Sequence, residues 1–427
     1  MKVLNKIIYG VVIGFIGIMA LVSLSCNSST PSSSSGSKVT IKGSFTGGTN
    51  AQNNWMRRFF ARLTKSAYAL DPSQVMKVIV FSNNWSYEIA PVTNNTFSID
   101  VSTGQPVGMI FAGANDNFLG YLTLGNGIDS LPLTRLTDTA TIDLQALSSN
   151  GKIVEPGHNP IGSEIPLTQA EQSALAQSNS LFASTVINPD VDGNGKIDLL
   201  EGKFFKWQIL YFINGGTISS TGANIAATLI TPASISGFRL AVGLPLDNAP
   251  GTVSFSGPAG SGLSNSTSDQ SITNNIQHVY FSSYIQNPPI PAAGQYTITY
   301  GNTALNFSMP DQSAAPSKIV VAAPTIILNS DGTINKIKWT YNLGDGSGSI
   351  DPVFLIGRVL IQIEGSGTPC ANYPQGSGWL YQSDSIPPST TEFTLPCQSV
   401  VWSNVSRLYM VVTDIFDNQY IVTFQRQ

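Results

Sequence analysis

Short apolar segments with alternating polar residues recur along most of this 427-residue chain. In residues 38–45, for example, Val39, Ile41 and Phe45 fall on one side of an extended backbone. Turns rich in Asn and Gly separate these segments. Charged residues make up only 11% of the chain, too few for the exposed faces of many long helices. The pattern therefore predicts a mainly β protein built from sandwiches.

The alternating runs divide the chain into three regions that we expect to be β-sandwiches: residues 38–165, 236–314 and 315–427. The runs predicted as strands are 38–45, 75–81, 85–89, 97–101, 107–111, 118–124, 140–144, 238–242, 252–255, 278–284, 296–300, 304–309, 318–321, 334–341, 356–363, 393–395, 408–413 and 420–424. A chain of this length accommodates about three domains.

Each of the three regions resembles a known kind of module. In the first, the run Phe97-Ser98-Ile99-Asp100-Val101 followed by a Gly-containing strand resembles carboxypeptidase-regulatory or transthyretin-like modules. The short runs of 236–314 resemble an Ig-like sandwich. Trp339 in an early strand and Tyr409 in a late strand resemble a fibronectin type III module. These resemblances imply a series of Ig-like β-sandwiches.

Residues 166–235 interrupt the β pattern, and we expect a small helical insertion there. Thr168 followed by Glu171 is a capping box, which predicts a helix over Pro166–Phe182. A second helix is predicted over Leu199–Phe212. It is apolar on most sides and must therefore be buried.

Asp190–Glu201, between the two predicted helices, resembles the EF-hand calcium loop at every key position. Ca²⁺ binds about six to eight oxygen ligands, and the resemblance places them at alternate positions. Gly195 permits the left-handed turn that curls the chain, and Ile197 anchors the loop in apolar contacts. The predicted ligands are Asp190, Asp192, Asn194, Lys196 through its carbonyl group, Asp198 directly or through water, and Glu201.

Only one such loop is present, whereas EF-hand proteins usually pair two. Pro189 also disfavours a helix that runs directly into the loop. We therefore expect a structural calcium ion rather than a cooperative sensor. The alternative is a solvated acidic turn.

The N-terminus has the pattern of an export signal. Residues 1–25 contain Lys2 and Lys6, followed by an uncharged apolar run, and a small residue, Ser25, precedes Cys26. This arrangement resembles the lipobox of bacterial lipoproteins, which implies that Cys26 carries a lipid. Residues 26–37 are rich in Ser and would form a flexible tether. The alternative, an uncleaved membrane anchor, also holds the chain outside the cytoplasm.

The segment Trp55–Lys65 has apolar residues on one helical face and Arg and Lys on the other. We expect an amphipathic helix docked on its own domain. Contact with a membrane surface is the alternative, since this segment lies near the predicted lipid anchor in sequence.

Cys370 and Cys397 remain as a pair if Cys26 is lipidated. An even number of cysteines in an exported chain predicts a disulfide, with two free thiols as the alternative.

The sequence contains no recognisable catalytic motif. It has only two histidines, His158 and His278, and no zinc or phosphate-binding motif. A net charge of −4 gives no general reason to bind nucleic acid. We therefore expect a non-enzymatic, calcium-binding lipoprotein at the outer membrane or cell surface, serving in adhesion, ligand binding or envelope scaffolding. Its partner would be an unidentified protein or glycan. The alternatives are an extracellular hydrolase or its carbohydrate-binding module, and a structural subunit of an envelope or export complex.

Overall fold

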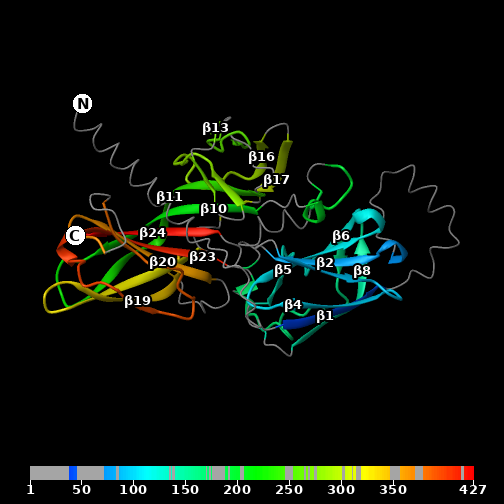
Figure 1. Ribbon diagram of the computed structural model, residues 1–427, viewed down its shortest axis with the longest axis horizontal. Coiled ribbons are helices and arrows are strands. Elements are labelled where there is room, and N and C mark those ends of the chain that lie inside the picture. Colours follow the sequence, from blue (N-terminus) through cyan, green and yellow to red (C-terminus); the bar gives the residue numbers. More distant parts are fainter. Residues whose placement is uncertain are drawn as a thin grey trace. The chain divides into compact units, whose positions relative to one another are not determined.

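Strands make up 58% of the protein in its computed structural model, and most of them belong to two large sheets arranged like sandwiches (Figure 1). The predicted mainly β class is thereby confirmed. The structure describes residues 38–45, 72–82, 86–133, 136, 140–169, 171–172, 175, 188–190, 193–201, 206–245, 253–263, 266–267, 270–273, 277–300, 303–309, 311–313, 319–346, 356–370, 378–414 and 418–427.

Several predictions fall on other parts of the chain. The signal peptide 1–25, the lipidated Cys26, the tether 26–37 and the amphipathic helix 55–65 all lie outside the described residues.

The first large sheet is formed by the N-terminal part of the chain. Its main path has the order β3-β2-β5-β6-β9-β8-β1-β4, and β7 pairs with β5. The strands are β1 (Lys38–Phe45), β2 (Lys77–Ser82), β3 (Tyr87–Pro91), β4 (Thr96–Ser102), β5 (Pro106–Ala112), β6 (Phe118–Leu122), β7 (Leu131–Pro132), β8 (Thr141–Asn150) and β9 (Ile153–Glu155).

The core of this sheet follows the predicted alternation. Val39, Ile41 and Phe45 of β1 are all buried, as expected from the period of two. The ring of Phe45 lies 5.3 Å from that of Phe111 on β5 and 6.1 Å from that of Phe97 on β4. Aromatic side chains from three strands thus pack together inside this sandwich.

The second large sheet has the order β21-β20-β23-β24-β10-β11-β18-β19-β22 along its main path, with β15 paired to β11 and β14 to β15. Its strands are β10 (Lys206–Ile218), β11 (Asn224–Pro245), β14 (Gln270–Thr273), β15 (Gln277–Phe281), β18 (Val320–Leu328), β19 (Ile334–Leu343), β20 (Ile356–Gly365), β21 (Trp379–Gln382), β22 (Glu392–Thr394), β23 (Val405–Asp414) and β24 (Gln419–Arg426).

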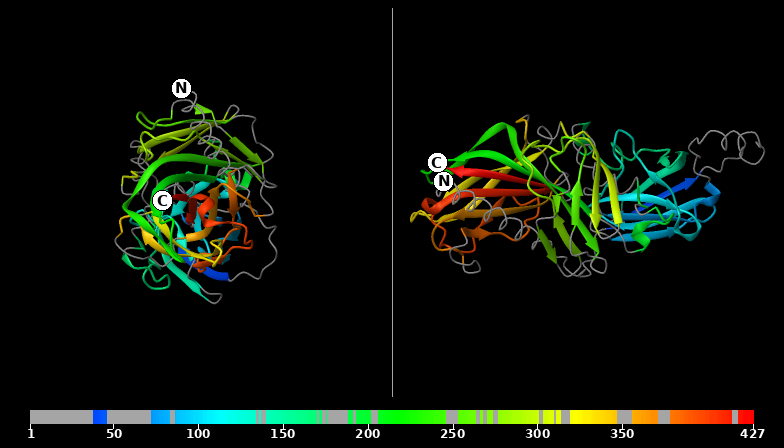
Figure 2. Two further views of the ribbon diagram at one scale, coloured as in Figure 1. Left: turned by 90° about the vertical axis from the view of Figure 1, so that its left-hand side faces the viewer. Right: turned by 90° about the horizontal axis from the view of Figure 1, so that it is seen from above.

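Two features bring distant parts of the chain into this sheet. β24 lies beside and parallel to β10, about two hundred residues earlier in the chain (Figure 1, Figure 2). The long strand β11 pairs with β18 through Asn224–Ala226 and with β15 through Ala241–Pro245. Residues from 206 to 426 therefore contribute to one sheet.

Four further strands of the described residues belong to neither large sheet. β12 (Val253–Ser256) pairs with β13 (Ser266–Thr267), and β16 (Gly294–Tyr300) with β17 (Thr303–Met309). Single 3-10 turns are η1 (Pro72–Gln74), η2 (Ala114–Asp116), η4 (Asp198–Glu201) and η6 (Trp402–Asn404).

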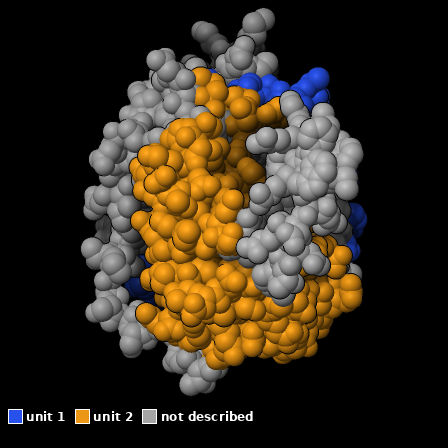
Figure 3. Space-filling view, turned by 90° about the vertical axis from the view of Figure 1, so that its right-hand side faces the viewer, with its two compact units in different colours: residues 1–32, 208–294, 311–427 blue, residues 33–207, 295–310 orange. Residues whose placement is uncertain are grey.

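By internal contacts the chain separates into two compact units (Figure 3). One contains the described residues of 33–207 and 295–310, including the first large sheet. The other contains those of 208–294 and 311–427, including the second.

The helix predicted over Leu199–Phe212 is wrong. Asp198–Glu201 forms one 3-10 turn, and β10 begins at Lys206. Ile209, Leu210 and Tyr211 are all buried because β10 has neighbours on both sides and both of its faces are covered. A strand buried on both faces shows a continuous apolar run, which periodicity alone does not separate from a buried helix.

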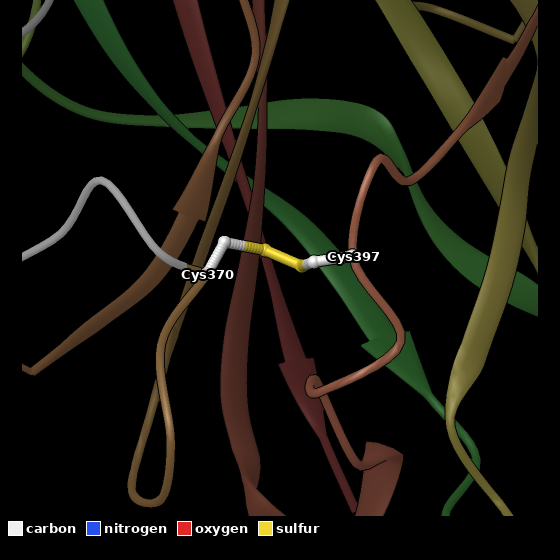
Figure 4. Close-up of a disulfide and its surroundings, with 2 residues drawn as sticks. All are labelled: Cys370 and Cys397. Carbon is white, nitrogen blue, oxygen red and sulfur yellow. A yellow bond between two sulfur atoms is a disulfide. The ribbon is translucent and has the colours of Figure 1, made fainter.

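The disulfide between Cys370 and Cys397 is present, as predicted (Figure 4). Cys370 lies after β20, and its N–H donates a hydrogen bond to the carbonyl oxygen of Leu380 in β21. Cys397 follows β22, and the two Cα atoms are 5.8 Å apart. The bridge thus joins the connection between β20 and β21 to the connection that follows β22, and β21 and β22 are the two end strands of the main path of the second sheet.

Candidate metal centre

The described part of the segment Asp190–Glu201 curls back on itself and is held by hydrogen bonds. Residues 190 and 193–201 are described, whereas the predicted ligand Asp192 lies outside the described residues. The N–H of Asp198, inside the loop, donates to the carbonyl oxygen of Pro189, directly before the loop, at 2.8 Å. This bond therefore brings the second half of the loop close to the residue before its start.

Two glycines permit this curl. Gly195 has a φ of 87°, the left-handed conformation that the sequence predicts at this position, and Gly193 has a φ of 72°. A Cβ atom at either position would meet no atom within 4 Å, so backbone conformation rather than space favours glycine here.

Polar side chains in the described part of the loop form hydrogen bonds within it, both to backbone N–H groups and between side chains. Asp190 Oδ2 accepts a hydrogen bond of 3.0 Å from the N–H of Gly195. Asn194 Oδ1 accepts one of 2.8 Å from the N–H of Lys196, and Asn194 Nδ2 donates to Glu201 Oε2 at 2.7 Å. The first, fifth and twelfth residues of the loop therefore lie close together.

Asp190 also carries an unsatisfied atom. Its Oδ1 is buried and has no hydrogen-bond partner. A buried carboxylate oxygen without a partner is costly, and a cation beside it would remove that cost. This observation fits a metal ion, as does the set of donors, which are all oxygens and suit a hard cation such as Ca²⁺.

The described carboxylates are not yet gathered around a common point. Within the described residues, no three His, Cys, Asp or Glu side chains lie in an arrangement able to hold a metal ion. Glu201 instead contacts the amide of Asn194, and its Oε1 lies 3.7 Å from the ammonium group of Lys196. Ion binding would require Glu201 to exchange the Asn194 amide and the Lys196 ammonium group for the cation.

An EF-hand has a helix on each side of its loop, and the two flanks of this loop compare differently with that arrangement. On the entering side, Glu171 Oε2 accepts from the N–H of Thr168, and Thr168 Oγ1 accepts from the N–H of Glu171, so the predicted capping box forms. Gln172 is helical there, but most of Pro166–Phe182 lies outside the described residues. On the exit side, a strand replaces the expected helix. The predicted helical EF-hand insertion is therefore not what the described residues form.

One contact of the loop, between Ile197 and Asp116, was not expected from the sequence. The N–H of Ile197 donates to the carbonyl oxygen of Asp116, in the turn between β5 and β6, at 3.1 Å. No sequence signal could have predicted this bond, because its acceptor is a backbone carbonyl group far along the chain.

A serine and an acid lie beside His158, but this cluster does not have the geometry of a catalytic triad. Ser163 Oγ and both carboxylate oxygens of Glu164 contact the same ring atom, His158 Nε2, at 3.2, 3.0 and 2.9 Å. A triad requires the nucleophile and the acid on opposite ring nitrogens. The side chain of His278 lies outside the described residues, while its backbone pairs with that of Leu244 in β11.

Comparisons with known proteins add no assignment to this geometry. No protein-family model matches the chain, and no curated protein matches its sequence. Among the described residues, no helix is both long enough and apolar enough to cross a membrane.

Proposed function

We propose that this protein is a lipid-anchored, extracytoplasmic β-sandwich protein that is stabilised by one bound calcium ion. Its role is non-catalytic: adhesion, binding of a protein or glycan ligand, or scaffolding of the cell envelope. The observation that carries the proposal is the curled loop Asp190–Glu201, with the buried, unpartnered Oδ1 of Asp190.

Asp190, Asn194 and Glu201 would hold the ion, together with Asp192, Asp198 and the carbonyl group of Lys196. Four carboxylates against one lysine leave this short loop strongly anionic. A bound divalent cation would neutralise this charge and draw Glu201 away from Asn194 and Lys196. Because the unfolded loop has no preformed site, part of the binding free energy becomes folding free energy.

The remaining observations favour export and a binding role. A disulfide is typical of chains that fold in an oxidising compartment. The leader and Cys26 predict a lipid anchor on the same side of the membrane. Among the described residues, the Ser-His-acid cluster at His158 lacks the geometry of a catalytic triad, which disfavours a hydrolase that uses this cluster.

Calcium titration of the full chain tests the metal site. The protein is extracted in detergent, freed of metal with a chelator and titrated with Ca²⁺ by calorimetry, with Mg²⁺ as the comparison ion. We expect a dissociation constant of about 0.1–1 mM, as in extracellular modules. A Ca²⁺ concentration about 100 times that value should stabilise the folded state by about 2.7 kcal/mol.

Glu201→Gln should abolish most of this response, because it removes the acid that closes the loop. Glu155→Gln is the matched control, since Glu155 is an exposed acid on β9. Equal calcium binding by Glu201→Gln and the unaltered protein would contradict the assignment, as would the absence of binding in the millimolar range.

A further inference from the structure

The candidate calcium loop is attached to the first large sheet by a specific hydrogen bond. Ile197 lies in the second half of the loop, and its N–H donates to the carbonyl oxygen of Asp116 at 3.1 Å. The side chain of Ile197 is fully buried, and that of Leu199 is only 4% exposed. This half of the loop is therefore held by both a backbone bond and apolar contacts.

The accepting carbonyl group belongs to an unusually constrained turn. Asn115 and Asp116 both have left-handed backbone conformations, with φ values of 59° and 65°. The N–H of Gly113 donates to the carbonyl oxygen of Asn117 at 3.0 Å, which closes the turn between β5 and β6. Two consecutive left-handed residues other than glycine cost free energy and persist only where their surroundings hold them.

A salt bridge connects this turn to the neighbouring strand. The ammonium group of Lys77 on β2 contacts Asp116 Oδ1. β2 and β5 are adjacent, and the residue paired with Lys77 is Ala112, the last of β5. The position of the Asp116 carbonyl group is thus determined by two strands of the sheet.

The loop is tied at the next residue as well. Asp198, a predicted ligand, donates its N–H to the carbonyl oxygen of Pro189 at 2.8 Å, directly before the ligand Asp190. Ile197 binds the turn of the sheet and Asp198 binds the residue before the loop, so two consecutive residues link the sheet to the start of the site.

We propose that the β5–β6 turn, residues Gly113–Asn117, positions the calcium loop, with Asp116 and Ile197 as the positioning residues. The inference rests on the proposed calcium binding. In an EF-hand pair, each loop is supported by the other. This protein has a single such loop, and the β5–β6 turn of the first large sheet would support it instead. Calcium binding and the local stability of the β5–β6 turn are then thermodynamically linked, and each strengthens the other.

Hydrogen–deuterium exchange of the full chain, with and without Ca²⁺, tests this link. Calcium should slow exchange of the Ile197 amide and also of the Gly113 and Asn117 amides, which lie outside the loop. At saturating Ca²⁺ we expect protection of the turn to rise by about tenfold. Protection confined to residues 190–201 would overturn the inference while leaving calcium binding intact.

A pair of substitutions tests the same link through affinity. Ile197→Ala removes the buried anchor without removing a ligand side chain or altering charge. It should weaken Ca²⁺ binding by about tenfold, as supporting residues of metal sites do. Ile142→Ala on β8 is the matched control, because Ile142 is equally buried in the same unit but does not contact the turn through any described hydrogen bond. Its affinity should stay within about twofold of the unaltered protein.

The possible outcomes separate the two proposals. If Ile197→Ala does not fold, Ile197→Val should show a smaller weakening in the same direction. Unchanged calcium affinity in the folded Ile197 variant would overturn the positioning role alone. Failure of the unaltered protein to bind Ca²⁺ would overturn the proposed function together with this inference.

Discussion

At the scale of single residues, buried polar side chains in the second sheet depend on specific partners. Tyr409 on β23 is 5% exposed, and its hydroxyl donates to Glu364 Oε2 on β20 at 2.5 Å. Arg407 Nη1 donates to the same oxygen at 3.4 Å. Burial raises the pKa of Tyr409 above the ordinary value for tyrosine, and the negative charge of Glu364 raises this pKa further.

This raised pKa predicts a loss of stability in alkaline solution. An unfolded tyrosine loses its proton at about pH 10, whereas folded Tyr409 keeps its proton to higher pH. The contribution of Tyr409 to the free energy of unfolding is therefore fully present below the pKa of the unfolded tyrosine. It is lost as the pH rises from there through the pKa of the folded state. Urea unfolding between about pH 9 and pH 12 should show a free energy of unfolding that falls with pH, and less steeply in Tyr409→Phe.

In Tyr409→Phe, the fall of the unfolding free energy with pH should become shallower rather than vanish. Burial also raises the pKa values of Tyr121 and Tyr341, which still contribute to this fall. At neutral pH, Tyr409→Phe should cost about 1.5–3 kcal/mol, since it removes a hydrogen bond to a charged group. Tyr87→Phe is the control, because Tyr87 is 43% exposed. Equal alkaline slopes in Tyr409→Phe and the unaltered protein would rule out this role for Tyr409.

At the scale of elements, long-range pairing rather than local propensity determines the second sheet. β10 pairs in parallel with β24, register for register from Leu210 and Gln419 to Asn214 and Thr423. Parallel neighbours need a long connection, and here the connection between the two paired strands contains most of the C-terminal half of the chain. The disulfide between Cys370 and Cys397 adds a covalent link between two loops that no strand pairing of the described residues joins directly.

Loss of the disulfide should destabilise the unit that contains it. Cys370 and Cys397 are 27 residues apart, and closing a loop of this length in the unfolded chain contributes about 3–4 kcal/mol. The double variant Cys370→Ser with Cys397→Ser should lower the free energy of unfolding by about that amount. Urea unfolding of the oxidised and reduced forms provides the measurement.

The reduced, unaltered protein should match the double variant, which separates loss of the bridge from an effect of serine itself. A peptide linking the two cysteines should appear in mass spectra under non-reducing conditions. Identical unfolding midpoints for the oxidised and reduced forms would contradict a stabilising role.

At the scale of the whole molecule, the predicted location at a membrane depends on the first residues of the chain. The apolar run before Cys26 cannot remain in water without cost, and one lipid chain adds about 0.8 kcal/mol of membrane affinity for each buried CH₂ group. These residues lie outside the described part of the structure, so the lipid anchor stays a prediction from sequence.

Cys26→Ala should remove the thiol that carries the lipid and release the protein from the membrane fraction. Cell fractionation and mass spectrometry of the N-terminal peptide measure retention and modification. Ser28→Ala, two residues further on, should leave both unchanged. Equal membrane retention of Cys26→Ala and the unaltered protein would refute lipidation as the anchor.

The sequence alone determined where most strands lie. Each of the predicted runs overlaps an observed strand, and β1 has the predicted bounds Lys38–Phe45. It also identified the disulfide, the capping box at Thr168 and the left-handed backbone of Gly195. These features are local or depend on residue type, so period, turn chemistry and cysteine count are enough to predict them.

Only the tertiary structure decided which strands share a sheet. It made β10 a strand instead of a helix, and it joined β24 to β10 across the chain. It also attached Ile197 of the candidate calcium loop to the carbonyl group of Asp116. The physical reason is that backbone N–H and C=O groups are the same in nearly every residue. Side-chain pattern therefore specifies which face of a strand is buried, while the partner of each backbone group depends on how the whole chain packs.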